Sequence, residues 1–303
     1  MRGHARGLAV VIVGLAGVLV AGCGPPDGID GNLTGDWPAL PEPTNWVPDV
    51  GVCHPSNHKP TGPLFEYFPV DCQQQHVTET VHVGEFTGEA ADRVTPPPEG
   101  SAGWRAAYAE CDEAAAEYLG ADFRHGRLWL GVTLPTVPGW EGGGRWFRCE
   151  VIGSGVPELT DRLARDGSLA GALATDSPLL LRCFEATETD DGGSIDRMEP
   201  AECDESHNTE FVGIWPAPDV SYLDSEDPGA QDQVHGGCRE QVAEYADVPV
   251  DGNLIFRTGT IVTWIDEQDW DNGDRRFRCY LYLSDFDLTE SLEGAGTGGL
   301  PVR

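Results

Sequence analysis

Positive charge is scarce in this chain of 303 residues. Lysine and arginine together number 19 against 51 aspartates and glutamates, the formal net charge is −32, and Lys59 is the only lysine. Binding to nucleic acid or to anionic lipid headgroups requires clustered cations. The composition therefore excludes both kinds of partner, and the acidic surface is expected to keep the protein soluble.

Long apolar runs are also absent beyond the first 22 residues, so a multi-pass membrane protein is excluded. Residues 1–22 have the features of an export signal, with two arginines ahead of an apolar run that is too short to span a bilayer. The stretch from Leu19 to Cys23 resembles the lipobox of bacterial lipoproteins. This resemblance implies cleavage before Cys23, a lipid on its sulfur and acylation of its new amino group. An ordinary secretory signal is the alternative.

No Cys-x2-Cys pair occurs in the sequence, which disfavours a structural zinc site. Nine cysteines minus Cys23 leave eight, an even number. An even count in an exported protein predicts disulfide bonds made in an oxidising compartment. No metal and no cofactor are expected.

The eight cysteines fall into two similar sets of four. Their separations are 19, 39 and 38 residues in the first set and 20, 35 and 41 in the second, formed by Cys53, Cys72, Cys111, Cys149 and by Cys183, Cys203, Cys238, Cys279. This repetition predicts two tandem modules. The predicted divisions are a lipid-anchored flexible tether (23–50), the first module (51–152), a connector (153–178), the second module (179–286) and a disordered tail (287–303).

Within each module, the apolar period predicts the same order of elements. The third cysteine lies at helical spacing, in a segment that shares Cys-x-Glu-x2-Ala-Glu-Tyr between the copies, and the fourth lies in an alternating strand. We expect an α+β fold in which one main helix covers each small antiparallel sheet and two disulfides fasten each module. Within the connector, Pro157 to Ala174 has the leucine spacing of a short amphipathic helix.

Four cysteines allow three pairings in each module, and the residues alone do not choose between them. We expect the helix cysteine to pair with the second cysteine of its module. The first cysteine then pairs with the last.

A histidine and a glutamate recur after the second cysteine as Cys-x3-His-x2-Glu. They are His76 and Glu79 in the first copy and His207 and Glu210 in the second. Both carboxylates alternate in step with apolar residues, so they should point into the core, where an unpaired charge costs several kcal/mol. The repeated inward arginines, Arg145 and Arg275, are the expected partners. We predict that Glu79 pairs with Arg145 and Glu210 with Arg275.

A ligand-binding or catalytic role for the same residues is the alternative. Histidine and glutamate both bind zinc, but residues three apart in a regular strand face opposite sides, so His76 and Glu79 should not share one ion unless the chain bends. No nucleophile and no second carboxylate recur beside them. No catalytic residue is therefore predicted.

The repeated motifs resemble the septum formation-related domain of bacterial envelope proteins, here seen twice. The resemblance is strongest at Val70 to Glu79, Glu202 to Glu210, Arg145 to Cys149 and Arg275 to Cys279. The family often has Asp before its first cysteine and Pro before its histidine; this chain has Val52 and Arg182, then Gln75 and Ser206. The resemblance implies a membrane-attached extracytoplasmic domain associated with septation, without established catalytic residues.

Together these features predict a lipid-anchored binding or scaffolding protein of the cell envelope rather than an enzyme. An envelope protein or the cell wall is the expected partner, and a groove with tryptophans between the modules is the expected place of contact. The alternatives are a secreted metal-dependent hydrolase that uses the repeated histidines and glutamates, and a solute-binding lipoprotein.

Overall fold

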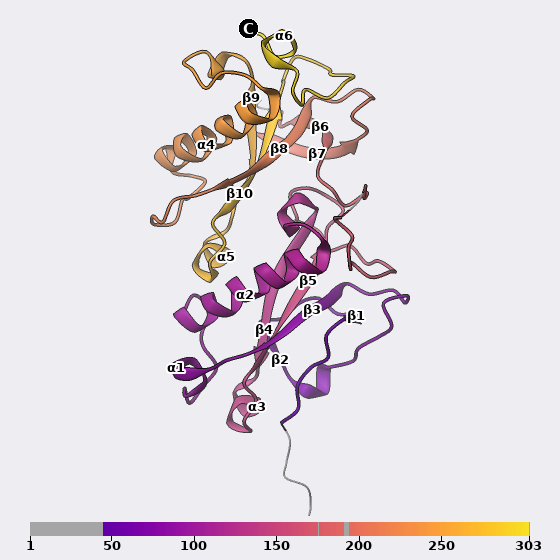
Figure 1. The fold of residues 1–303 in the computed structure, drawn as a ribbon, viewed down its shortest axis with the longest axis vertical. Coiled ribbons are helices and arrows are strands. Elements are labelled where there is room, and N and C mark those ends of the chain that lie inside the picture. The colour runs from indigo at the N-terminus through magenta and orange to yellow at the C-terminus, as the bar shows by residue number, and fades with distance from the viewer. Residues whose placement is uncertain (1–44, 175, 191–193, 303) are drawn as a thin grey trace, which may run out of the picture. The chain divides into compact units, whose positions relative to one another are not determined.

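Two five-stranded sheets, each with a long helix against it, organise the chain (Figure 1). The structure is a computed structural model that describes residues 45–302 apart from 175 and 191–193. These residues belong to one compact unit. The expected signal peptide, most of the tether and the lipobox Cys23 lie outside the described residues.

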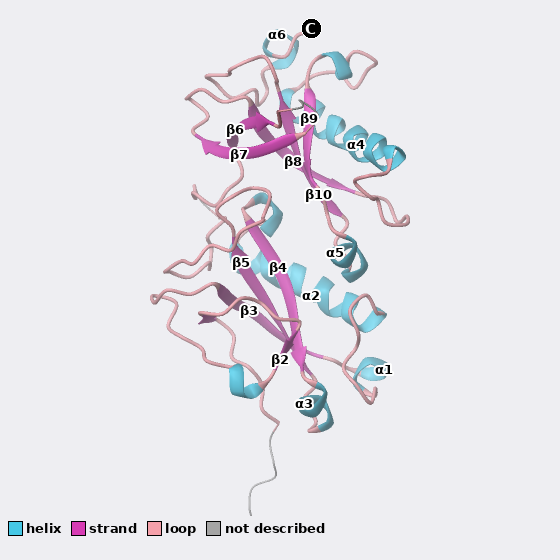
Figure 2. Ribbon diagram, turned by 180° about the vertical axis from the view of Figure 1, so that it is seen from behind, coloured by secondary structure: helices cyan, strands magenta, loops and turns pink. Residues whose placement is uncertain are grey.

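The first sheet has the strand order β1-β3-β5-β4-β2. Its strands in chain order are β1 (Val52–His54), β2 (Thr61–Gly62), β3 (Thr78–Glu85), β4 (Leu128–Pro135) and β5 (Trp146–Gly153). All neighbours are antiparallel except β2, which runs parallel to β4. Helix α2 (Ala102–Leu119) packs against one face, as the two opposite views in Figures 1 and 2 show.

The second sheet has the order β7-β6-β8-β10-β9, with every pair antiparallel. Its strands are β6 (Cys183–Glu188), β7 (Ile195–Ala201), β8 (Thr209–Pro216), β9 (Gly259–Thr263) and β10 (Arg276–Tyr282). Helix α4 (Pro228–Ala246) packs on β8 and β10. The order β6-β8-β10-β9 repeats the order β1-β3-β5-β4, so the mixed α+β fold with two sheets is confirmed.

The two long helices begin and end as their sequences favour. Ser101 and Asp227 each accept a hydrogen bond from a backbone N–H of the first turn, and Gly120 ends α2 with a left-handed φ of 89°. Cys111 and Cys238 are fully buried on the inner faces. This confirms the prediction that each third cysteine lies on the buried side of a helix.

The remaining helices are short. They are α1 (Gly88–Ala91), α3 (Val137–Glu141), α5 (Glu267–Asn272), α6 (Gly296–Gly299) and the 3-10 turns η1 (Leu64–Glu66), η2 (Phe123–His125) and η3 (Leu254–Phe256). Over the described residues, no helix is both long enough and apolar enough to cross a membrane.

All eight predicted cysteines form disulfides, but the expected pairing is wrong. The first cysteine of each half bonds to the second, and the helix cysteine bonds to the last, as Cys53–Cys72, Cys111–Cys149, Cys183–Cys203 and Cys238–Cys279. The reason is the sheet order. In each half the inner face of the long helix lies over the strand that carries the last cysteine, β5 or β10, whereas the strand that carries the first cysteine, β1 or β6, lies two positions away in the sheet.

The connector and the tail differ from the expectations. No α-helix forms between Pro157 and Ala174 over the described residues, and Leu169 and Leu173 instead join the core of the first half. Over residues 287–302 the tail packs on the second half instead of being disordered, because Leu292 and Leu300 are buried in its core. Each segment therefore completes the half that precedes it.

We predict that removing either kind of disulfide destabilises the fold by a similar amount. The Cys53–Cys72 and Cys111–Cys149 bonds close segments of 19 and 38 residues, for which loop entropy gives about 3 to 4 kcal/mol each. Urea unfolding of the C53A/C72A and C111A/C149A variants measures the loss. Mass mapping of non-reduced peptides that joined Cys53 to Cys149 would contradict the pairing itself.

Candidate functional site

Two carboxylates are completely buried at corresponding places in the two halves. Glu79 on β3 is paired in register with Cys53 of β1, and Glu210 on β8 with Cys183 of β6. Both glutamates have 0% of their surface exposed. The prediction that these side chains point into the core is confirmed.

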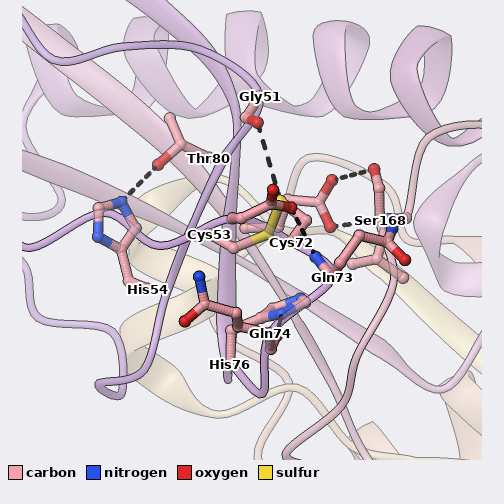
Figure 3. The surroundings of a disulfide bond; sticks show 12 residues. Gly51, Cys53, His54, Cys72, Gln73, Gln74, His76, Thr80 and Ser168 are labelled. Atoms are coloured by element: carbon pink, nitrogen blue, oxygen red, sulfur yellow. Dashed lines mark hydrogen bonds between the residues drawn. A yellow bond between two sulfur atoms is a disulfide. The ribbon is translucent and has the colours of Figure 1, made fainter.

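Each carboxylate accepts hydrogen bonds from the same three kinds of donor. Glu79 receives the Tyr118 hydroxyl at 2.6 Å, the Ser168 hydroxyl at 2.5 Å and the Leu169 backbone N–H at 2.8 Å. Figure 3 shows Ser168 in the surroundings of the Cys53–Cys72 disulfide. These donors provide hydrogen-bond partners for a carboxylate that is buried away from water. Burial, and then the bond to Glu79, raise the pKa of Tyr118, so this hydroxyl keeps its proton.

The second half repeats this arrangement. Glu210 receives the Tyr245 hydroxyl at 2.6 Å, the Ser291 hydroxyl at 3.1 Å and the Leu292 N–H at 2.9 Å. The tyrosines are the last residues of the shared Cys-x-Glu-x2-Ala-Glu-Tyr motif, and the serines come from the connector and from the tail. The carboxylates therefore explain why those two segments are ordered.

The predicted ion pairs of Glu79 with Arg145 and of Glu210 with Arg275 are wrong. Glu79 is in register with Val151, six residues along β5 from Arg145, a separation of about 20 Å in a strand. The same offset separates Leu281, the register partner of Glu210, from Arg275. A different arginine lies near Glu79: Nη1 of Arg165 in the connector is 3.6 Å from its carboxylate.

Arg145 and Arg275 have a different shared role. Each guanidinium stacks on a tryptophan, with 4.2 Å from Arg145 to the Trp140 ring and 3.9 Å from Arg275 to the Trp270 ring. Each also donates to the backbone carbonyl of that same tryptophan, near the end of the short helix α3 or α5. The arginines thus cap helix carbonyls, where positive charge is favourable.

The histidines lie closer to the glutamates than a regular strand allows. His76 precedes β3 and forms an isolated bridge with Arg165, so the chain bends before Glu79. In the second half His207 Nε2 is 3.1 Å from Glu210 Oε1. The expectation that the two side chains face opposite sides is wrong, because the histidines are not part of the strands.

The bend brings together three atoms that could ligate a metal in each half. They are one sulfur, one imidazole nitrogen and one carboxylate oxygen, all within 4.8 Å of one another, from Cys53, His76, Glu79 and from Cys183, His207, Glu210. Each sulfur is already bonded in a disulfide, and a metal ligand must be a thiolate. Each carboxylate already accepts several hydrogen bonds. We interpret both clusters as structural.

A buried arginine joins the two halves, and the sequence patterns did not reveal it. Arg124 of η2 is fully buried, and its guanidinium lies 2.9 Å from Asp274 of the second half and 2.8 Å from Asp112 of the first. Burial disfavours its charge, but Asp274, Tyr108 and Asp122 outweigh that effect and raise its pKa. These contacts of one guanidinium with carboxylates from both halves hold the halves together.

A second arginine strengthens the same contact from the other side. Arg278 of β10 is buried and donates to the carbonyls of Arg124 at 3.0 Å and of Leu128 at 2.7 Å. The Phe-Arg-His-Gly stretch that contains Arg124 recurs in the second half as Phe-Arg-Thr-Gly, and its arginine, Arg257, donates to Leu300 within its own half. The sequence therefore did not indicate that Arg124 contacts the other half.

The groove between the halves contains the expected tryptophans, but little space. Half-buried Trp129 lines two cavities of about 220 and 170 Å³, and half-buried Trp264 lines the smaller one; both volumes are below the 300 Å³ or more typical of ligand pockets. Trp129 donates its indole N–H to Asp269 at 3.1 Å. Burial, outweighing that hydrogen bond, raises the pKa of Asp269 to about 6. A larger cavity of about 650 Å³ lies along β9 instead.

A family comparison spans both halves. The model of the septum formation family matches residues 50–279 in one continuous match. This chain belongs to the septum formation family. Because the match is single, the family comparison does not divide the domain into tandem copies; the repetition of strand order and disulfides is a feature of the fold. No curated protein and no solved structure matches the chain.

We predict that the half-buried tyrosine of the second carboxylate site, Tyr245, stabilises the fold. Y245F removes the donor at 2.6 Å from Glu210 and should lower the free energy of unfolding by about 1 to 3 kcal/mol. Y282F is the matched control, because its hydroxyl bonds the exposed Glu188 and should matter by less than about 0.5 kcal/mol. Equal effects of the two substitutions in urea unfolding would contradict the assignment.

Asp269 should make stability depend on pH in a defined window. Its folded pKa of about 6 lies above the ordinary 3.8, so between these values the folded state holds a proton that the unfolded state has lost. Rising pH from about 4 to 6 therefore destabilises the protein, by at most about 3 kcal/mol from this group. Urea unfolding of D269N across this range should lack that component. A constant difference between variant and parent over this window would refute the proposed titration.

Proposed function

We propose that this septum formation family member is a lipid-anchored binding or scaffolding protein of the cell envelope. Membership of the family supports a role connected with cell division. The stretch from Leu19 to Cys23 supports a lipid anchor on the outer face of the cell membrane, and eight disulfide-bonded cysteines support an oxidising compartment outside the cytoplasm.

One observation supports a non-catalytic role: the histidines and glutamates that recur in both halves are buried in the interior. Glu79, Glu210 and both histidines are at most 1% exposed. A general acid or base must reach the proton it transfers, and a hydrolytic metal needs an open coordination position. The repeated histidines and glutamates therefore stabilise the two similar halves, and partners would bind to other residues on the surface. This reasoning disfavours the metal-dependent hydrolase.

The buried arginine network supports a scaffold as well. A flexible joint between the two halves would let partners bound on each half move independently. Arg124 and Arg278 instead fix the halves with charged hydrogen bonds that are buried. Pre-organised surfaces bind with a smaller entropic cost.

The lipid anchor and the division role are tested together in the native host. We expect the parent protein in the membrane fraction and concentrated at division sites by immunofluorescence, and C23S released from the membrane with correct disulfides. Deletion of the gene should delay septation and lengthen the cells, and the parent gene should restore them. Even distribution around the cell together with normal septation on deletion would overturn the proposal.

A second measurement tests the hydrolase alternative. Purified parent protein and the H76A/H207A double variant are compared for bound zinc after dialysis. Equal, trace zinc in both agrees with a binding protein. Stoichiometric zinc that disappears in the variant would favour the metal-dependent enzyme.

A further inference from the structure

The two sheets differ at one edge. In the first sheet the outer side of β4 is covered by β2, whose Thr61 and Gly62 are in register with Leu134 and Pro135. In the second sheet the corresponding strand β9 pairs only with β10, and over the described residues no strand covers its outer side. The edge that β2 covers in the first sheet is therefore open in the second sheet, at β9.

The register shows which backbone groups of β9 face outward. Val132 of β4 and Val262 of β9 correspond, because each is paired with the last cysteine of its half. In β4 the N–H of Leu134, two residues beyond Val132, donates outward to the Pro60 carbonyl at 3.0 Å. Backbone direction alternates along a strand, so Val262, and with it Thr260, present N–H and C=O groups to the outside.

Nothing in the sequence of β9 protects this edge. Edge strands are usually guarded by charged residues, proline or a bulge, which prevent pairing with other chains. The opposite edge of the same sheet, β7, has Asp196, Arg197, Glu199 and Pro200. In contrast, β9 reads Gly-Thr-Ile-Val-Thr, uncharged and rich in β-branched residues that favour strand pairing.

A groove of about 650 Å³ runs along this open edge. Residues Thr260 to Trp264 line it together with Gln231 and His235 of α4, and with Ile195 and Met198 of β7. Two carboxylates, Glu158 and Glu188, line it too, and among the described lining residues there is no lysine or arginine. The groove therefore offers backbone hydrogen bonds along β9, apolar contacts on both walls and negative charge.

We propose that β9 binds an extended basic peptide of a partner protein, which adds to the second sheet as a further strand. The backbone of the peptide would bond Thr260 and Val262, its apolar side chains would contact Ile195 and Trp264, and its cations would meet Glu158 and Glu188. Strand addition gives affinity through the main chain and specificity through alternate side chains. This inference rests on the proposed binding function and supplies the chemistry of the partner.

The test uses the full chain and a fluorescein-labelled synthetic peptide of about seven residues in which valine and lysine alternate, long enough to run along β9. Fluorescence anisotropy should show saturable binding. V262P removes an outward N–H without removing a bond to β10 and should weaken binding at least about tenfold. V262T keeps the N–H and is the matched control. E158Q/E188Q should weaken binding and reduce its dependence on salt.

Three further measurements remove ambiguity. A peptide methylated on alternate backbone nitrogens tests strand pairing with an unaltered protein, so the result does not depend on the folding of V262P. A valine and glutamate peptide tests charge and should not bind. Amide exchange at Thr260 and Val262 should slow when the lysine peptide is added.

The proposal is overturned if the lysine peptide shows no saturable binding, if methylation or V262P leaves binding unchanged relative to V262T, or if the glutamate peptide binds equally well. Failure here differs from failure of the proposed function. Peptide binding in the test tube without localisation at division sites would reject the septation role alone, and localisation without peptide binding would reject the β9 site alone.

Discussion

A carboxylate enclosed in an apolar core is the constraint on which each half of this protein depends. Leaving such a group without donors costs several kcal/mol, and Glu79 and Glu210 are each met by a tyrosine, a serine and a backbone N–H. The tyrosine comes from the long helix, while the serine and the N–H come from the segment after the last strand. One side chain thus connects the sheet, the helix and a trailing segment, and if either trailing segment moved away its carboxylate would lose two hydrogen-bond donors.

The two halves share this interior but differ at their surfaces. The first half supplies Arg124 to the contact between halves, and the second receives it with Asp274. The first half covers the outer edge of β4 with β2, and the second half extends its opposite edge with β7. The halves thus share their internal hydrogen bonds, while the second half presents a sheet edge at β9 that the first half covers at β4.

The sequence correctly predicted the features that depend on the local spacing of apolar residues. It did not predict contacts between residues that are far apart in the chain. Alternation placed Glu79 and Glu210 in the core, and helical spacing placed Cys111 and Cys238 on buried faces; both are confirmed. The predicted ion-pair partners were wrong because alternation shows on which face of the sheet a side chain lies, but not which residues of the neighbouring strands lie beside it. Arg145 shares a face with Val151 yet lies six residues away from the level of Glu79. The predicted disulfide pairing was wrong for a similar reason, because the local spacing of residues does not determine which strands are neighbours in a sheet.

The loop that ends in β2 has a practical consequence for chemical labelling. Lys59 lies in that loop with 60% of its side chain exposed and forms a surface ion pair with Glu66 at 2.7 Å, an interaction too weak to shield its amine. As the chain has no other lysine, amine-reactive reagents attach to side chains at this single position, beside the closed edge of the first sheet. Reagents that couple carboxylates would report on the rest of the surface, including the open edge of the second sheet.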